Sequence, residues 1–231
     1  MAALFSLDGF LFLLRWLHFM AGITWIGMLY YLNFAQTPFL ATDLGGAARS
    51  PIQRGLLPNV LWWFRWGAMI TFLTGWTIVI TKLAVGGSSS AYYATILTGG
   101  ILGTFMWYNV WFVIMPRQRV IMANAENVAA GKPVDPAAAA VGPVAGRASR
   151  TNTLFSIPML FFMGAASHLT IASHAEPQVH LYLALVLILA AIFEANIFTG
   201  TVPKPLSTVS GTIHSGLGLT LVLFVVASLL L

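Results

Sequence analysis

Six stretches of the chain, each of about twenty residues or more, consist almost entirely of apolar side chains. An α-helix needs about 20 such residues to cross a bilayer, and it satisfies its own backbone polar groups there. Charged residues make up only 7% of the 231 residues, against about 25% in an ordinary soluble domain. We therefore expect an all-α, polytopic bundle of about six transmembrane helices, folded as a single domain over residues 1–231.

Proline, glycine and polar residues separate the expected helices. Between the third and fourth helices lies a linker of residues 116–150, in which residues 120–130 fit a short surface helix. Residues 131–146 are rich in Ala, Pro, Val and Gly, and we expect them to form a linker that is either extended or mobile. The six expected helices cover about residues 5–34, 59–83, 92–115, 152–173, 179–198 and 206–231.

Lysine and arginine are concentrated in the connections after the first, third and fifth expected helices. The connections after the second and fourth helices hold at most Lys82. The positive-inside rule then predicts that both termini lie outside and that the linker 116–150 is cytoplasmic. We expect a multi-pass protein of a bacterial inner membrane, surrounded by lipid. The basic residues on the predicted inner side are Arg49, Arg54, Arg117, Arg119, Lys132, Arg147, Arg150 and Lys204.

The chain contains no cysteine. This excludes disulfides, thiolate metal sites, iron–sulfur clusters and a covalently attached c-type haem. Any metal must be held by His, Met, Asp or Glu. The net charge of +5 follows the membrane topology, so we expect no nucleic-acid partner.

The first expected helix carries Arg15 and His18 within its apolar run. Ionisable groups in a membrane span are costly, so they mark candidate functional sites. Gly22 lies one helical turn after His18, and Gly164 lies one turn before His168. A glycine at this spacing leaves room beside the imidazole for a flat, bulky group or for another helix. We interpret His18 and His168 as axial metal ligands of a non-covalent b-type haem.

The expected topology places these two histidines at similar depths near the outer face, so they could bind the two faces of one haem. Arg15, one turn nearer the surface, could pair with a haem propionate. His214 is expected deeper, near Glu194, with which it could share a hydrogen bond. For His214 three readings stay open: a haem ligand, a helix-packing residue among small side chains, or a group in proton or quinone chemistry.

Two segments carry a resemblance to a known family. They are Arg15-Trp16-x-His18-x-x-Ala21-Gly22-Ile23-x-Trp25-Ile26-Gly27 and Asn152-Thr153-x-x-x-x-Pro158-x-x-Phe161-x-Met163-x-x-x-Ser167-His168. This pattern resembles the N-terminal membrane domain of bacterial membrane-bound urate oxidases (urate hydroxylases). The resemblance implies a multi-helix membrane module and electron transfer towards cytochrome c, with His18 and His168 as the residues carried over. In that family a C-terminal cytochrome c domain follows the membrane domain, and this chain has no C-x-x-C-H motif.

The sequence thus favours a membrane-integral, haem-binding electron-transfer protein that passes electrons to a separate periplasmic cytochrome or to a larger complex. Without a cytochrome domain, urate oxidation is not supported, and enzymatic activity as a redox subunit stays open. One alternative is a cofactor-free accessory subunit of a membrane redox or photosynthetic complex. Another is a copper-binding membrane protein that uses His168, His174 and His180 with Met159 and Met163. The sequence leaves the oligomeric state open.

Overall fold

The computed structural model describes residues 2–86, 88–169, 171 and 175–231. Three stretches of the chain are helical from end to end, although each changes type along its length. The first joins α1 (Leu7–Tyr30), η2 (Tyr31–Gln36) and α2 (Thr37–Leu40). The second joins α3 (Asp43–Pro51), η3 (Ile52–Leu56) and α4 (Leu57–Val85), and the third joins α5 (Ser90–Tyr108), η4 (Asn109–Ile114) and α6 (Met115–Ala129). The remaining elements are η1 (Ala2–Phe5), α7 (Pro136–His168), α8 (Val179–Thr199), η5 (Lys204–Ser207) and α9 (Val209–Leu230).

Within the described residues, five helical stretches are long and apolar enough to cross a membrane: Leu7–Leu40, Asp43–Val85, Ser90–Ala129, Val179–Thr199 and Val209–Leu230. The expected all-helical architecture and its membrane character therefore agree with the structure. Helix α7, whose second half contains most of the fourth expected span, is not among the five. The number of spans and the side on which the termini lie stay predictions.

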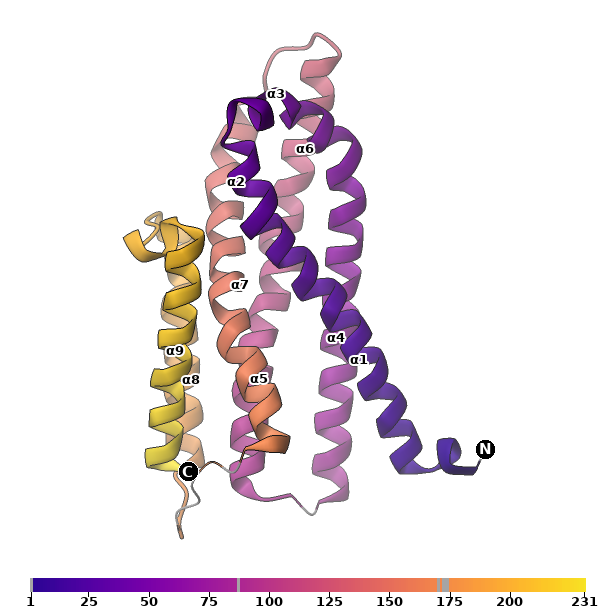
Figure 1. The fold of residues 1–231 in the computed structure, drawn as a ribbon, viewed down its shortest axis with the longest axis vertical. Coiled ribbons are helices and arrows are strands. Elements are labelled where there is room, and N and C mark those ends of the chain that lie inside the picture. Colours follow the sequence, from indigo (N-terminus) through magenta and orange to yellow (C-terminus); the bar gives the residue numbers. More distant parts are fainter. Residues whose placement is uncertain (1, 87, 170, 172–174) are drawn as a thin grey trace.

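Helix α7 stands in the middle of the bundle (Figure 1). It contacts α1, η2, η4, α5, α6, α8 and α9. Helices α8 and α9 lie side by side on one flank, and α1 crosses α4 on the other. Both chain termini lie at the end of the bundle where α7 ends, which we call the lower end (Figure 1). The turns of α3 and of the α6–α7 connection lie at the opposite, upper end.

The expectation of a linker over residues 131–146 is wrong, because α7 begins at Pro136. The side chain of Asp135 caps this helix by accepting a hydrogen bond from the Ala137 backbone N at 2.9 Å. Proline is favoured at a first helical position, and alanine is the best helix former. The same alanine-rich composition that suggests a linker therefore forms the first turns of the helix. The connection after α1, expected as a loop, is also mostly helical.

Candidate functional site

The centre of α7 carries a row of polar side chains that are fully buried. Thr151, Asn152, Thr153 and Ser156 are each at most 4% exposed. Neighbouring helices supply polar partners to this row and to the turn before it. On the side of α1, the Tyr30 hydroxyl lies 2.9 Å from the Ser156 hydroxyl. Because buried polar groups are costly unless they are bonded, these contacts fix how α7 faces its neighbours.

The polar interior also contains a cluster of Asn109, Asn152 and Glu194, which we call the amide–carboxyl cluster. The Asn109 Nδ2 donates to Asn152 Oδ1 at 3.0 Å and to Glu194 Oε1 at 2.8 Å. The Asn152 Nδ2 donates to the backbone O of Met106 at 3.0 Å. Both asparagines are completely buried, and Glu194 is 9% exposed. The cluster thereby joins α5, η4, α7 and α8 in the interior.

Two asparagines that bond to α7 lie on π-helical turns. Asn33 lies in η2 and donates to the Ser149 hydroxyl at 2.8 Å, while Asn109 is the first residue of η4. A π turn contains one extra residue, and such turns occur frequently at functional sites. Here each π turn directs an amide towards the central helix.

His18 lies between α1 and α4. Its Nδ1 is 3.1 Å from the Thr74 hydroxyl oxygen, and a Cβ added to Gly75 would come within 2.9 Å of its Cε1. The Thr74 hydroxyl donates its proton to the backbone O of Ile70 at 2.7 Å. It can then only accept from His18, so Nδ1 carries the imidazole proton and Nε2 keeps a lone pair. A histidine that ligates a metal is typically oriented by such a bond from its other ring nitrogen.

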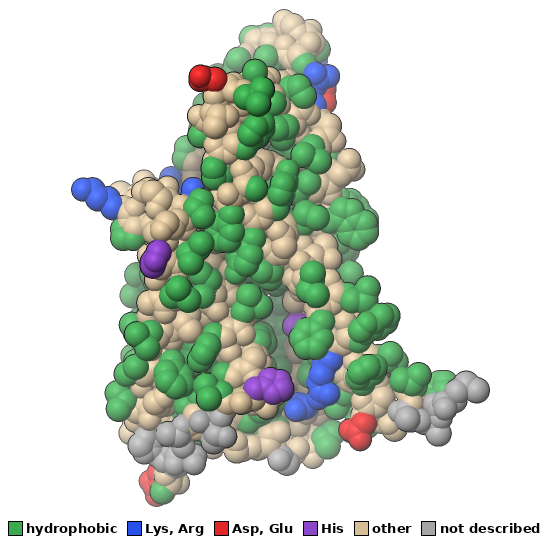
Figure 2. All heavy atoms as spheres, viewed as in Figure 1, with side chains coloured by type: hydrophobic (Ala, Val, Ile, Leu, Met, Phe, Trp, Pro, Cys, Tyr) green, Lys and Arg blue, Asp and Glu red, His purple; other side chains and the backbone are tan. Residues whose placement is uncertain are grey.

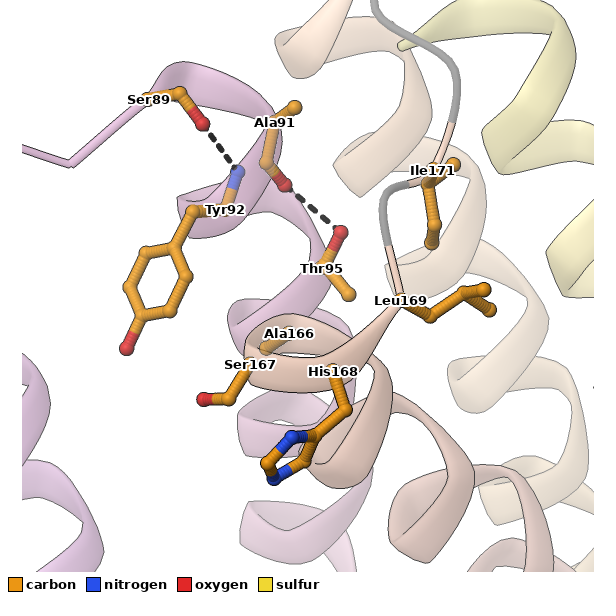
Figure 3. A pocket seen from close by; sticks show the side chains of 9 residues that line it. All are labelled: Ser89, Ala91, Tyr92, Thr95, Ala166, Ser167, His168, Leu169 and Ile171. Atoms are coloured by element: carbon orange, nitrogen blue, oxygen red, sulfur yellow. Dashed lines mark hydrogen bonds between the residues drawn. The ribbon is translucent and has the colours of Figure 1, made fainter.

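His168 is the last residue of α7 and is exposed. It lines a cavity of about 270 Å³ at the lower end of the bundle, together with Tyr92, Thr95 and Ser167 (Figure 3). Ligand pockets usually measure about 300–1,000 Å³, so this cavity does not by itself accommodate a haem. A Cβ added to Gly164, one turn before His168, would meet nothing within 4 Å. Gly164 is thus on the surface of α7 and packs against no neighbouring helix of the described structure.

The structure places His18 and His168 on elements that share the lower half of the bundle (Figure 1). Figure 2 shows this part of the surface hollowed, with histidine and basic side chains in and beside the hollow. Arg15 is exposed on α1, one turn before His18. Gly22 faces α4 instead of open space, since an added Cβ would lie 3.9 Å from Thr71 Cγ2. Gly22 thus serves the packing of α1 on α4.

His214 does not bond to Glu194, and that expectation is wrong. His214 is exposed on α9, where its Nδ1 donates to the Ser210 backbone O at 2.7 Å. The Glu194 carboxyl group instead accepts a hydrogen bond from Asn109, which lies on η4. The small residues around His214 pack helices as one reading expected, because an added Cβ at Gly216 would collide with Ile157 of α7.

Of the residues considered for copper, the structure describes Met159, Met163, His168 and His180. Met159 and Met163 pack against Gly99 of α5, where an added Cβ would lie 3.0 Å from Met163 Cγ. His180 is exposed at the start of α8, and His174 lies outside the described residues. Within the residues that the structure describes, no three His, Cys, Asp or Glu side chains form a group able to hold a metal ion.

Comparison with known families adds one finding. The sequence model described as urate oxidase N-terminal matches residues 87–199. The chain thus carries a urate oxidase N-terminal-like domain. The match contains Asn109, Asn152, Glu194 and His168, and it leaves out α1 and α4 with His18. Comparisons with curated proteins and with solved structures give no match.

Reasoning from the sequence missed the amide–carboxyl cluster. The signal was present, because asparagine is rare in an apolar span, and Asn109 and Asn152 both lie within expected helices. The expected site is built on histidines at a similar depth, and it therefore does not include these neutral amides. The sequence shows that Glu194 is a carboxylate well inside an expected helix. Its expected partner, His214, lies on α9, whereas its partner in the structure, Asn109, lies on η4.

Proposed function

We propose that this protein is a membrane-integral electron-transfer protein that binds a b-type haem through His18 and His168. The observation that carries the proposal is the orientation of His18. Its Nδ1 donates to Thr74, whose own proton is given to Ile70, so the lone pair of Nε2 is available to a metal.

The remaining residues at this end have complementary roles. His168 is exposed at the end of α7 and has open space beside Gly164, where a flat group can approach. Arg15 offers a cation for an acidic substituent on the outer side of His18. When bound, a haem supplies an iron that takes up and releases single electrons. The apolar helices around it exclude water and so stabilise the less charged form of the group.

The partner is proposed to be a separate periplasmic cytochrome or a larger membrane redox complex. Both termini lie at the end that carries His168 (Figure 1), and the positive-inside rule, applied to the basic connections, favours that end as the outer one. A bacterial inner membrane is the proposed location. Similarity to a urate oxidase N-terminal domain supports a redox setting, and the reaction of the partner is left to experiment.

The test is an optical spectrum of the purified protein, oxidised and then reduced, combined with a pyridine haemochrome assay. We expect a b-type spectrum in the unchanged protein and its loss in His18→Ala and in His168→Ala. His180→Ala is the matched control, because His180 is an exposed histidine at the same end of the bundle, and it should retain the spectrum.

A featureless spectrum from protein purified with its native partners would contradict the haem proposal. The accessory-subunit alternative would then hold if the protein co-purified in an assembly that tolerates both histidine changes. Stoichiometric copper without haem would instead favour the metal-binding alternative.

A further inference from the structure

We propose that Glu194 is a proton-exchanging carboxyl group in the interior of the bundle, held by Asn109, which is itself bonded to Asn152. It binds a proton and releases it, and the Asn109 amide keeps it in place in both states. This site is separate from the histidines and does not rest on the haem proposal.

In the amide–carboxyl cluster, the numbers of hydrogen-bond donors and acceptors do not match. The two Nδ2 protons of Asn109 are both used, by Asn152 Oδ1 and by Glu194 Oε1. The Oδ1 of Asn109 is buried and has no hydrogen-bond partner within the described structure. Acceptors therefore outnumber donors. A proton on Glu194 converts one acceptor oxygen into a donor and corrects this imbalance.

Glu194 has no neutralising cation within the described residues. Within the described residues, the ion pair that forms joins Arg54 and Glu126 and does not include Glu194. A buried carboxylate without a cation is costly, and such groups tend to take up a proton. Glu194 is nevertheless not sealed off, because 9% of it is exposed.

The ionisable groups on the surrounding helices already have other positions or partners. On α7, Arg147 directs its Nε to a backbone carbonyl of α8 at 2.7 Å, and Arg150 is partly buried one turn further along. On α9, His214 is exposed and bonded to its own helix. On α5, Tyr108 is exposed. Within the described residues, these groups therefore leave Glu194 without a cationic partner.

Infrared difference spectroscopy during a pH titration tests the proposal directly. A protonated carboxyl group gives a carbonyl stretching band that its ionised form lacks. We expect this band to appear on acidification of the unchanged protein and to be absent from Glu194→Gln. Glu126→Gln, which removes an exposed carboxylate, is the matched control and should retain the band.

Asn109 has its own readout in the same experiment. In the protonated state its Nδ2 still donates to the carbonyl oxygen of Glu194, and this bond lowers the stretching frequency. Asn109→Leu should therefore shift the band to higher frequency without removing it. A band that is absent at every pH, or that persists unchanged over the whole titration, would overturn the proposal.

A chemical measurement on the unchanged protein covers the case in which Glu194→Gln does not fold. An apolar carbodiimide reacts with a protonated carboxyl group inside a membrane protein. The acid proton passes to a carbodiimide nitrogen while the carboxyl oxygen bonds to the central carbon, and the acyl group then migrates to nitrogen as a stable N-acylurea. No electron is exchanged, and no second reactant is needed.

Mass spectrometry of the digested protein should find this adduct on Glu194 at acid pH and its loss at alkaline pH. A water-soluble carbodiimide is the control reagent and should modify the exposed Glu126 in preference to Glu194. If the apolar reagent leaves Glu194 unmodified at every pH and the infrared band is also missing, the carboxyl group is permanently ionised and the proposal is wrong.

Discussion

Polar side chains are buried and bonded to one another in the amide–carboxyl cluster, whereas at the lower end of the bundle the histidines keep polar atoms without a partner among the described residues. In the cluster, Asn109, Asn152 and Glu194 are buried and bonded to one another. At the lower end, His168 is exposed and His18 has a ring nitrogen with a free lone pair. The first arrangement is nearly complete within the chain itself. The second has coordinating capacity left over, and this difference separates a self-contained polar cluster from a candidate cofactor-binding site.

The largest expected effect comes from breaking the cluster. Asn152→Leu removes the donor to the Met106 carbonyl and one acceptor of Asn109. Leaving a buried polar group unpaired costs about 1–3 kcal/mol. We expect a loss of about 3 kcal/mol in the free energy of unfolding, measured by denaturant titration in detergent micelles. The control is Asn196→Leu on α8, which loses only an exposed bond to Thr201 and should change stability by less than about 0.5 kcal/mol.

A second pair of substitutions compares Gly99, which packs α5 against α7, with Gly164, which is exposed on α7. At Gly99 an added Cβ already lies 3.0 Å from Met163 Cγ and 3.2 Å from the Met159 backbone O. We expect Gly99→Val to lower the unfolding free energy by about 2 kcal/mol through overpacking. Gly164→Val meets open space and should leave stability nearly unchanged. If Gly164→Val nevertheless weakens haem binding, the open space beside His168 belongs to the cofactor.

Removing the hydrogen bond that orients His18 should have a smaller effect, which concerns only haem affinity at the lower end. Thr74→Val keeps the size of the side chain and removes the acceptor for His18 Nδ1. Loss of a partner that orients a ligand typically costs about 10–100-fold in affinity. We expect haem affinity, measured by titration of the apoprotein, to fall by at least about tenfold. Thr77→Val, whose exposed hydroxyl bonds only to Leu73 O, is the control, and equal affinities in both variants would contradict the proposed role.

The smallest expected effect comes from an exposed ion pair, and it measures how much such a contact contributes to the free energy of unfolding. Arg54 Nε and Glu126 Oε2 form an ion pair at 3.0 Å, with side chains 41% and 56% exposed. Exposed pairs contribute about 0–1 kcal/mol and weaken with salt. Glu126→Gln should therefore change the unfolding free energy by less than about 1 kcal/mol. A larger loss than in Asn152→Leu would reverse the ranking of buried over exposed contacts.

The helical class, the membrane character and most helix positions follow from apolar length alone. The expected helix 179–198 matches α8 (Val179–Thr199), and 59–83 lies within α4. The resemblance built on the segment from Asn152 to His168 is confirmed by the family match over residues 87–199. These features depend on hydropathy and local pattern, which a single sequence displays.

What the sequence did not show depends on how the helices face one another. The sequence predicts a similar depth for Glu194 and His214, but Glu194 bonds to Asn109 of η4 and His214 bonds within α9. Gly22 could equally have faced a cofactor or a helix, and it faces Thr71. Residue spacing gives the height of a side chain along a helix. Its direction around the bundle is set by contacts that only the folded chain contains.

The π turns at η2 and η4 have a consequence for how this fold tolerates changes in length. Each behaves as a single inserted residue within an otherwise α-helical rod. Removing that residue inside η4 would close the helix to a regular α form and leave α6 facing nearly the same way, but it would change the direction of the Asn109 amide. A one-residue deletion in the regular part of α5 would instead rotate everything beyond it by about 100°. The fold should therefore tolerate a change of length at η4 better than at the neighbouring α-helical turns.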